Sequence, residues 1–302
     1  MSPEKCNIAL FGCGTVGTGV ASMLLGRRGA AAERFGDRLE LSYIVDKRID
    51  YVRREISPPG SVTVTDDIDA VIADDDVDVV VELFGGVEMA GTLVERAFKS
   101  DKDVVTANKA LLAEKGDSLF RLARQCGKSI AYEASAAGGI PVVSALREDF
   151  AADHIRSLYG IVNGTCNYIL TRMTEAGLSY DTALKEAKEK GYAEADPTLD
   201  VEGHDSAHKL AVLAREAFGA HVELEDVACE GITGISVTDL EYARRMGLTL
   251  KLLAMARKTE QGMELRVHPT LLPHSHPLAN IREAYNAVCV HAETAGEVIL
   301  TG

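Results

Sequence analysis

A glycine-rich turn near the N-terminus is the feature that most constrains the fold of this chain. Residues 7–11 form a short apolar run that leads directly into the sequence G-C-G-T-V-G at residues 12–17. Beyond the turn, apolar residues recur at roughly helical spacing (Val20, Met23, Leu24 and Leu25). A strand, a tight turn and a helix in this order form the context in which a G-x-G-x-x-G motif binds a dinucleotide. The sequence therefore predicts a nucleotide-binding unit at the N-terminus.

Each glycine of the motif has a separate physical task. Gly12 permits the tight turn, Gly14 lets the backbone approach a pyrophosphate, and Gly17 allows close packing of the helix. The free N–H groups at the start of the helix are suited to bind phosphate. The residues that we expect to contact the cofactor here are Phe11, Gly12, Gly14, Thr15, Val16 and Gly17.

The next strand, expected at residues 39–45, ends at Asp46, and Lys47 and Arg48 follow. An acid at this position binds the ribose hydroxyls of NAD, whereas basic residues accommodate the extra phosphate of NADP. Both kinds of side chain are present here. The sequence favours NADP(H) slightly, and NAD(H) stays open as the alternative cofactor.

Strands and helices alternate through the first part of the chain. Further strands are expected at residues 77–84, 103–106 and 129–134, with helices near residues 90–98 and 118–125. This alternation is typical of the α/β class, with a doubly wound parallel sheet of the Rossmann type. We expect a dinucleotide-binding domain over residues 1–134.

The pattern changes after Gly138-Gly139-Ile140-Pro141. Helices are expected near residues 142–149, 168–176, 180–190 and 203–218, and strands follow at 248–256, 263–269, 287–292 and 297–300. This order predicts a second, α+β domain over residues 135–302, which would bind the substrate and form a dimer.

Charge and cysteine content exclude several classes of protein. The formal net charge of −14 disfavours binding to nucleic acid or to anionic lipid. No charged segment followed by an apolar one opens the chain, and no apolar run reaches the roughly 18 residues that span a bilayer. The six cysteines form no C-x-x-C pair, which is typical of reduced thiols. We therefore expect a cytoplasmic protein.

An acidic segment over residues 192–209 suggests the substrate. Five carboxylates precede Lys209 (Glu194, Asp196, Asp200, Glu202 and Asp205). Such a density favours a site for a small cationic group, and the alternative is a solvated acidic turn. On a helix beginning near Gly203, Asp205 and Lys209 are four residues apart and project from one face.

Taken in order, these motifs resemble those of the homoserine dehydrogenases. Besides the two segments above, the resemblance includes T-A-N-K at 106–109, E-A-S-A-A-G-G-I-P at 133–141 and N-G-T-C-N-Y at 163–168. It covers nearly the whole chain. The resemblance implies reversible reduction of L-aspartate 4-semialdehyde to L-homoserine with NADP(H) or NAD(H), in the biosynthesis of threonine, methionine and isoleucine.

The resemblance also assigns roles to individual residues. It implies that Lys209 and Lys109 are catalytic, and it leaves open which of the two donates the proton. Lys109 is also expected to contact the cofactor near its nicotinamide. Backbone carbonyls of Glu133, Ala136, Gly138 and Ile140 would bind a monovalent cation, which is usually sodium in this family. The residues expected to contact the substrate are Glu194, Asp205, Asp200, Tyr192, Gly164 and Thr165, with Asn163 to Thr165 supplying donors for its carboxylate. A homodimer is expected through the second domain.

Two other functions are consistent with parts of the sequence. A semialdehyde dehydrogenase of a different class would use a cysteine thiolate, for which Cys166 is the candidate. A non-catalytic redox sensor would bind the nucleotide alone. The sequence also departs from the family in one respect, because members usually continue with a Gly-rich turn and a helix that returns to the nucleotide domain. We therefore expect that returning element to be absent.

Overall fold

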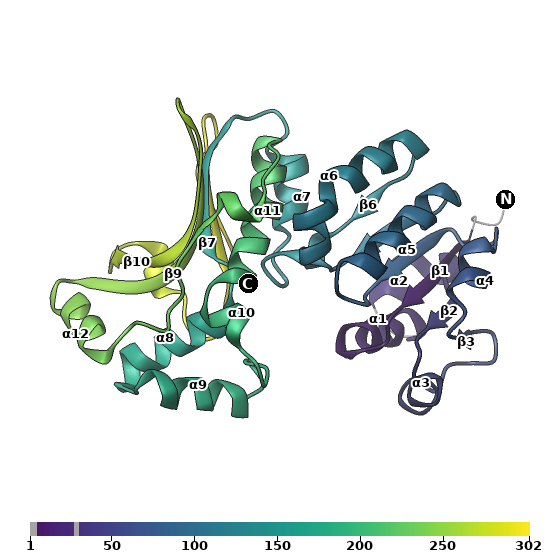
Figure 1. The fold of residues 1–302 in the computed structure, drawn as a ribbon, viewed down its shortest axis with the longest axis horizontal. Helices are drawn as coiled ribbons and strands as arrows, with labels where there is room; N and C mark the ends of the chain where they lie inside the picture. Colours follow the sequence, from purple (N-terminus) through teal and green to yellow (C-terminus); the bar gives the residue numbers. More distant parts are fainter. Residues whose placement is uncertain (1–4, 27–29) are drawn as a thin grey trace. The chain divides into compact units, whose positions relative to one another are not determined.

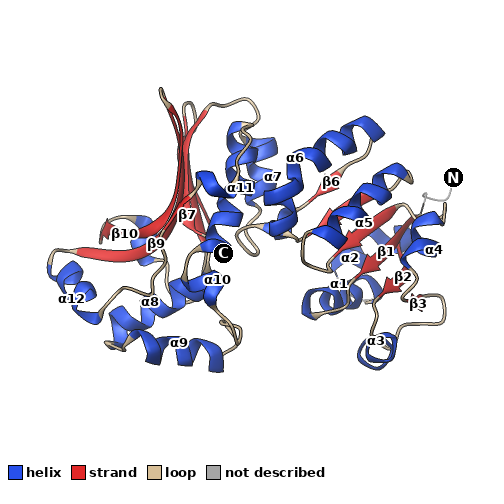
Figure 2. Cartoon of the chain, viewed as in Figure 1, coloured by secondary structure: helices blue, strands red, loops and turns tan. Residues whose placement is uncertain are grey.

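The computed structural model describes residues 5–26 and 30–302. The chain divides into two compact units, Met1–Tyr132 and Glu133–Gly302. Each unit has its own six-stranded sheet. Strands and helices alternate in the first unit, and a separate sheet with its own helices forms the second (Figure 2).

The sheet of the first unit is parallel throughout and has the strand order β3-β2-β1-β4-β5-β6. Its strands are β1 (Cys6–Phe11), β2 (Leu39–Val45), β3 (Thr63–Thr65), β4 (Val79–Glu82), β5 (Asp103–Thr106) and β6 (Ile130–Ala131). The helices are α1 (Thr15–Leu25), α2 (Ala30–Phe35), α3 (Ile49–Ile56), α4 (Ile68–Ala73), α5 (Glu88–Lys99) and α6 (Lys109–Cys126). This order confirms the predicted Rossmann-type sheet.

The central strands of this sheet are apolar because both of their faces are covered. Leu10 and Ile44 are fully buried, and Val81 is nearly so. They pack in one core with Ala21 of α1 and Val52 of α3. The strand order reverses between β1 and β4, and ligands of open α/β sheets bind beyond the carboxyl ends of the strands at this position.

The second unit contains a mixed sheet of order β12-β11-β7-β9-β10-β8. Its strands are β7 (Ile155–Ile161), β8 (Ala228–Cys229), β9 (Leu248–Thr259), β10 (Gly262–Pro273), β11 (Ala287–Ala292) and β12 (Gly296–Thr301). All neighbouring strands are antiparallel except for the pair β8 and β10, which is parallel. The unit therefore has the predicted α+β character.

The helices of this unit are α7 (Val142–Ser144), α8 (Gly164–Ala176), α9 (Tyr180–Glu189), α10 (Thr198–Val201), α11 (His204–Phe218) and α12 (Val237–Arg245). Of these, α8, α11 and α12 pack against strands of the sheet. Helix α11 contacts β7, β9 and β10, and it lies along one side of the sheet in Figure 1. Its buried side, which includes Leu210 and Leu213, packs on apolar strand residues.

Several predicted elements differ from the structure, and one strand was missed. The strand expected at 129–134 is limited to Ile130–Ala131, and a 3₁₀ turn follows at Glu133–Ser135. The helix expected at 142–149 is a short α-helix followed by a π-helical turn at Ala145–Asp149. Strand β7 was not predicted, because its alternation includes Arg156, Ser157 and Gly160 and so lacks a strong apolar pattern. No helix in the described part of the chain is long and apolar enough to cross a membrane.

Candidate active site

The turn after β1 has the geometry that a bound pyrophosphate requires. Gly12 has φ +95°, and a Cβ atom there would lie 2.6 Å from the carbonyl oxygen of Leu83. A Cβ atom on Gly17 would lie 2.0 Å from the carbonyl oxygen of Gly12. No side chain caps the first turn of α1, so its N–H groups are directed to whatever lies beyond it. The observed geometry therefore fits the phosphates of a dinucleotide.

Asp46 follows β2 and is tied to Arg48 by several hydrogen bonds. The guanidinium donates to both carboxylate oxygens at 3.1 Å, and the backbone N–H of Cys13 donates to Oδ2 at 2.8 Å. The hydrogen bonds from Arg48 lower the pKa of Asp46 to about 2. The guanidinium also stacks on the ring of Tyr51, 4.7 Å from its centroid. The acid and the base expected to recognise the ribose thus form one ion pair.

A pocket of about 480 Å³ lies beside this ion pair. Its walls come from the segments that follow β2, β3 and β4, at the carboxyl edge of the sheet (Val45, Asp46, Lys47, Arg48, Asp66, Ile68, Phe84, Gly85 and Met89). The pocket is large enough for a nucleoside, and its position is where the adenosine half of a dinucleotide binds in this fold.

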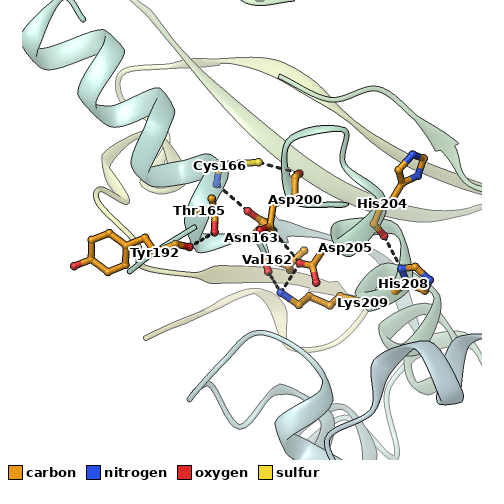
Figure 3. A network of polar contacts seen from close by, with 10 residues as sticks. All are labelled: Val162, Asn163, Thr165, Cys166, Tyr192, Asp200, His204, Asp205, His208 and Lys209. Atoms are coloured by element: carbon orange, nitrogen blue, oxygen red, sulfur yellow. Dashed lines mark hydrogen bonds and ion pairs between the residues drawn. The ribbon is translucent and has the colours of Figure 1, made fainter. Parts of the chain in front are cut away.

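In the second unit, Lys209 and Asp205 form the ion pair that their spacing predicts. The Lys209 Nζ lies 2.7 Å from Asp205 Oδ2 and donates to the carbonyl oxygen of Val162 at 2.8 Å (Figure 3). Both side chains are largely buried, with 18% and 8% of their surfaces exposed. Two of the three ammonium N–H bonds are therefore directed to the protein, which fixes the direction of the third.

Asn163 connects the acidic residues of this site. Its Nδ2 donates to Asp200 Oδ1 at 2.7 Å and to Asp205 Oδ2 at 2.8 Å, and its Oδ1 accepts from the backbone N–H of Cys166 (Figure 3). One amide thus bridges two carboxylates and caps α8. The sequence suggested only that Asn163 supplies a donor near the substrate. The amide bridge was missed, because it joins residues 37 and 42 positions apart.

The neighbouring Thr165 has a different partner from the one expected. Its hydroxyl donates to the carbonyl oxygen of Tyr192 at 2.5 Å, which holds the loop before α10 against the start of α8. The Tyr192 ring lies 4.8 Å from that of Tyr168 and is partly exposed. In this structure the Thr165 hydroxyl therefore positions a loop, and its expected contact with the substrate stays a prediction.

Cys166 does not have the properties of a nucleophile. Its side chain is fully buried, and its thiol donates to the carbonyl oxygen of Asp200 at 3.1 Å. Burial raises the pKa of this thiol well above its usual value, and the nearby Asp200 and Asp205 raise it further. The thiol stays protonated at neutral pH, which argues against thioester chemistry.

The remaining substrate candidates lie at the edge of this network. Glu194 is exposed in the loop between α9 and α10, and its carboxylate forms no hydrogen bond or ion pair with another described residue. Gly164 begins α8, and a Cβ atom there would lie 2.6 Å from the carbonyl oxygen of Ala284. Glu194 can therefore bind a ligand, whereas Gly164 is required for close packing of the 281–285 loop.

Lys109 is the first residue of α6 and directly follows Asn108, which caps the helix. The loop expected to bind a cation lies in the second unit. It turns sharply, because Ala137 and Gly138 have φ values of 54° and 61°. The Glu133 carboxylate accepts from the N–H groups of Val143 and Ser144 at 2.9 Å, which directs this side chain toward the start of the following helix.

Comparison with known proteins agrees with these observations. The family model of homoserine dehydrogenase matches residues 141–302, and that of the homoserine dehydrogenase NAD-binding domain matches residues 12–133. The homoserine dehydrogenase of Neisseria gonorrhoeae is 44% identical over 299 residues, which cover 99% of this chain and 68% of that protein.

Two solved structures show the same fold. The homoserine dehydrogenase from Thiobacillus denitrificans has a TM-score of 0.93 and 42% identity, over 99% of this chain and 69% of that one. A hyperthermophilic archaeal homoserine dehydrogenase in complex with NADPH has a TM-score of 0.80 and 26% identity, over 99% and 91% of the two chains. The chain belongs to the homoserine dehydrogenase family, whose members are NAD(P)-dependent oxidoreductases.

Proposed function

We propose that this chain reduces L-aspartate 4-semialdehyde to L-homoserine reversibly, with Lys209 as the proton donor. The observation that carries the proposal is the buried ammonium group of Lys209, which Asp205 and the Val162 carbonyl hold in one orientation. When bound, the nicotinamide cofactor supplies the hydride. As the hydride reaches the aldehyde carbon, the carbonyl oxygen gains negative charge and accepts a proton from Nζ. General acid catalysis of this kind contributes about 10²–10⁴-fold.

The acidic residues would bind the substrate's α-ammonium. Asp205 is shared between Lys209 and the Asn163 amide, and Asp200 accepts from the same amide while keeping part of its surface exposed. Glu194 is an exposed carboxylate in the adjoining loop. Carboxylates at the ammonium group place the aldehyde at the other end of this four-carbon substrate, where the lysine can reach it.

We infer that NADP(H) is the preferred cofactor. Lys47 and Arg48 both line the pocket beside Asp46, and an extra 2′-phosphate would find two cationic partners there. The Arg48 guanidinium already neutralises Asp46, which would otherwise repel that phosphate. NAD(H), which lacks the phosphate, would use Asp46 instead. The NADPH complex of the archaeal relative supports this assignment.

A monovalent cation, of the sodium type, would bind the carbonyl oxygens of the sharply turned loop. Its proposed ligands are the backbone oxygens of Glu133, Ala136, Gly138 and Ile140. No group of three or more His, Cys, Asp or Glu side chains could hold a metal in the part of the chain that the structure describes, so a cation there would need carbonyl ligands. Turnover should therefore fall when sodium is replaced by choline at constant ionic strength.

A homodimer would form through the open face of the second sheet. Strand register places Tyr159, Met255, Cys289 and Ile299 on one face, where three of the four are only partly buried. An apolar face of this kind favours association with a second copy. Static light scattering should give twice the mass of the chain at micromolar concentration, and a monomer would exclude the proposed interface.

Replacement of Lys209 tests the proposed reaction. The oxidation of NADPH in the presence of aspartate semialdehyde should be at least about tenfold slower in Lys209→Ala, with little change in cofactor affinity. Lys185→Ala is a matched control, because Lys185 also has a glutamate four residues away, Glu189 at 3.9 Å, but is exposed. Near-normal turnover in Lys209→Ala would transfer the donor role to Lys109.

A further inference from the structure

Glu82 is a buried carboxylate in the first unit and takes no direct part in the proposed reaction. It is the last residue of β4 and is completely inaccessible to solvent. No lysine, arginine or histidine among the described residues forms a salt bridge with it. A buried charge without a cationic partner is costly unless hydrogen bonds compensate for it.

Three donors compensate the charge of Glu82. Its Oε1 accepts from the backbone N–H groups of Phe84 at 2.9 Å and Gly85 at 3.3 Å, and its Oε2 accepts from the Thr106 hydroxyl at 2.6 Å. The first two donors belong to the loop after β4. The third belongs to the last residue of β5, which pairs with Glu82 across the sheet. The carboxylate therefore joins the ends of two neighbouring strands.

The Thr106 hydroxyl continues this network toward α6. Because a carboxylate only accepts, the hydroxyl must donate to Glu82, and its lone pairs can then accept. It accepts from the backbone N–H of Asn108 at 3.0 Å. Asn108 in turn caps α6 through the N–H of Leu111 and donates from Nδ2 to the carbonyl oxygen of Gly86 at 2.6 Å. Asn108, the residue before Lys109, is thus fixed by hydrogen bonds to the end of β5, to the loop after β4 and to the first turn of α6.

We propose that Glu82 and Thr106 are positioning residues that orient Lys109 for the reaction. This role rests on the proposed reaction, in which Lys209 donates the proton, and on the catalytic role that the family resemblance implies for Lys109. Glu82 lies at the carboxyl end of β4, beside the point where the strand order reverses, and its network fixes the two loops that follow β4 and β5. The side chain of a lysine at the start of a helix has a fixed orientation only if the first helical turn is fixed. The hydrogen bonds of Glu82, Thr106 and Asn108 fix this turn.

Thr106→Val tests the proposal, since it keeps the shape of the side chain and removes the hydroxyl. We expect kcat to fall about tenfold, because a misplaced catalytic group loses part of a 10²–10⁴-fold contribution. Thr106→Ser restores the hydroxyl and should return kcat to within about twofold of the wild type. Thr92→Val is the control, because the Thr92 hydroxyl bonds only to the Glu88 carbonyl oxygen on α5.

A double-mutant cycle separates positioning from a general loss of stability. In the Lys109→Ala background, Thr106→Val should lower kcat by less than about twofold, because the group that it positions is already absent. Multiplicative losses would show that the hydroxyl only stabilises the fold and would overturn the proposal. All assays are run below the thermal unfolding midpoint of each variant, measured by scanning fluorimetry.

Lys109→Ala by itself distinguishes the catalytic role of Lys109 from the positioning role of Glu82 and Thr106. Normal turnover in this variant would refute a catalytic role of Lys109 and the positioning role with it, but it would leave the proposed reaction with Lys209 as the donor intact. A strong loss in Lys109→Ala together with normal turnover in Thr106→Val would refute the positioning role alone. Glu82→Gln should lower kcat more than Thr106→Val does. The glutamine amide would point N–H groups at groups that also donate, and the loss would disturb Phe84 and Gly85, which line the nucleotide pocket.

Discussion

Asn163→Ser should weaken catalysis while keeping the cap of α8. The wild-type amide has two separate tasks, since Nδ2 bridges Asp200 and Asp205 and Oδ1 caps α8 at the N–H of Cys166. Serine is about as good an N-cap as asparagine, so the substitution keeps the cap and removes the bridge. Asn163→Ala removes both. A comparison of the two variants therefore isolates the bridge.

The size of the effect follows from the burial of the two acids. A hydrogen bond to a charged group contributes about 1.5–3 kcal/mol. Water can replace the amide at Asp200, which is half-buried, but not at Asp205, which is only 6% exposed. The loss at Asp205 corresponds to a decrease in kcat/KM of roughly ten- to 150-fold. Both kcat and KM should change, because Asp205 also holds Lys209.

The assay is homoserine oxidation at saturating cofactor, with the free energy of unfolding measured by urea titration. Asn163→Ser should lose activity and up to about 1.5–3 kcal/mol of stability, because the buried Asp205 carboxylate loses a donor. Asn163→Ala should lose about 1 kcal/mol more stability with no further loss of activity. The reasoning would be refuted by an Asn163→Ser variant whose kcat/KM stays within about threefold of the wild type. The amide would then be only a helix cap.

Three further predictions follow from the titrating groups. Cys166→Ser should keep kcat within about threefold, because burial raises the pKa of the Cys166 thiol and keeps it protonated; a loss of about a hundredfold would revive thiol chemistry. Arg48 lowers the pKa of Asp46 from 3.8 to about 2, so this carboxylate stabilises the fold above about pH 4 and its contribution is lost as the pH falls toward 2. Acidification should therefore destabilise Asp46→Asn less than the wild type over that range, and parallel curves would contradict the assignment. Burial lowers the pKa of Lys251 from 10.5 to about 8, so folding releases a proton between these values and stability increases with pH there. The stability of the wild type relative to Lys251→Met should rise by up to about 3 kcal/mol from pH 8 to 10.5 in urea titrations, and a constant difference would refute the shift.

Periodicity and glycine positions predicted most of the fold. The strand at residues 39–45 and the strand at 103–106 have the predicted bounds, because each is rich in β-branched or aromatic residues and lies between segments of different pattern. Strand β7 was missed, because its exposed positions are charged or small and its pattern is weak. Helix α6 begins at Lys109, nine residues before the predicted start. Its first turns contain the apolar residues Leu111, Leu112 and Ala113, but Gly116 interrupts the helical pattern and the capping residue Asn108 resembles a loop residue.

The active site was predictable only where partners lie close in sequence. Asp205 and Lys209 are four residues apart on one helix, so the helical repeat alone predicts their ion pair. Asn163 and Asp205 are 42 residues apart, and Glu82 and Thr106 are 24 apart. Such contacts depend on how strands and helices are placed in three dimensions, which local periodicity does not encode.

Glu82 is ambiguous in the sequence for the same reason. An acid at the carboxyl end of a parallel strand can bind a ligand, because that edge of the sheet is where ligands bind. Its complete burial and its three donors show instead that the protein itself satisfies this carboxylate. Asp46 also follows a strand of this sheet, and its two oxygens accept from the backbone N–H groups of Arg48 and Cys13 and from the Arg48 guanidinium, which is half exposed. We therefore expect these two acids to differ in function, because the partner of Asp46 can be reached by a ligand and the donors of Glu82 hold it inside the protein.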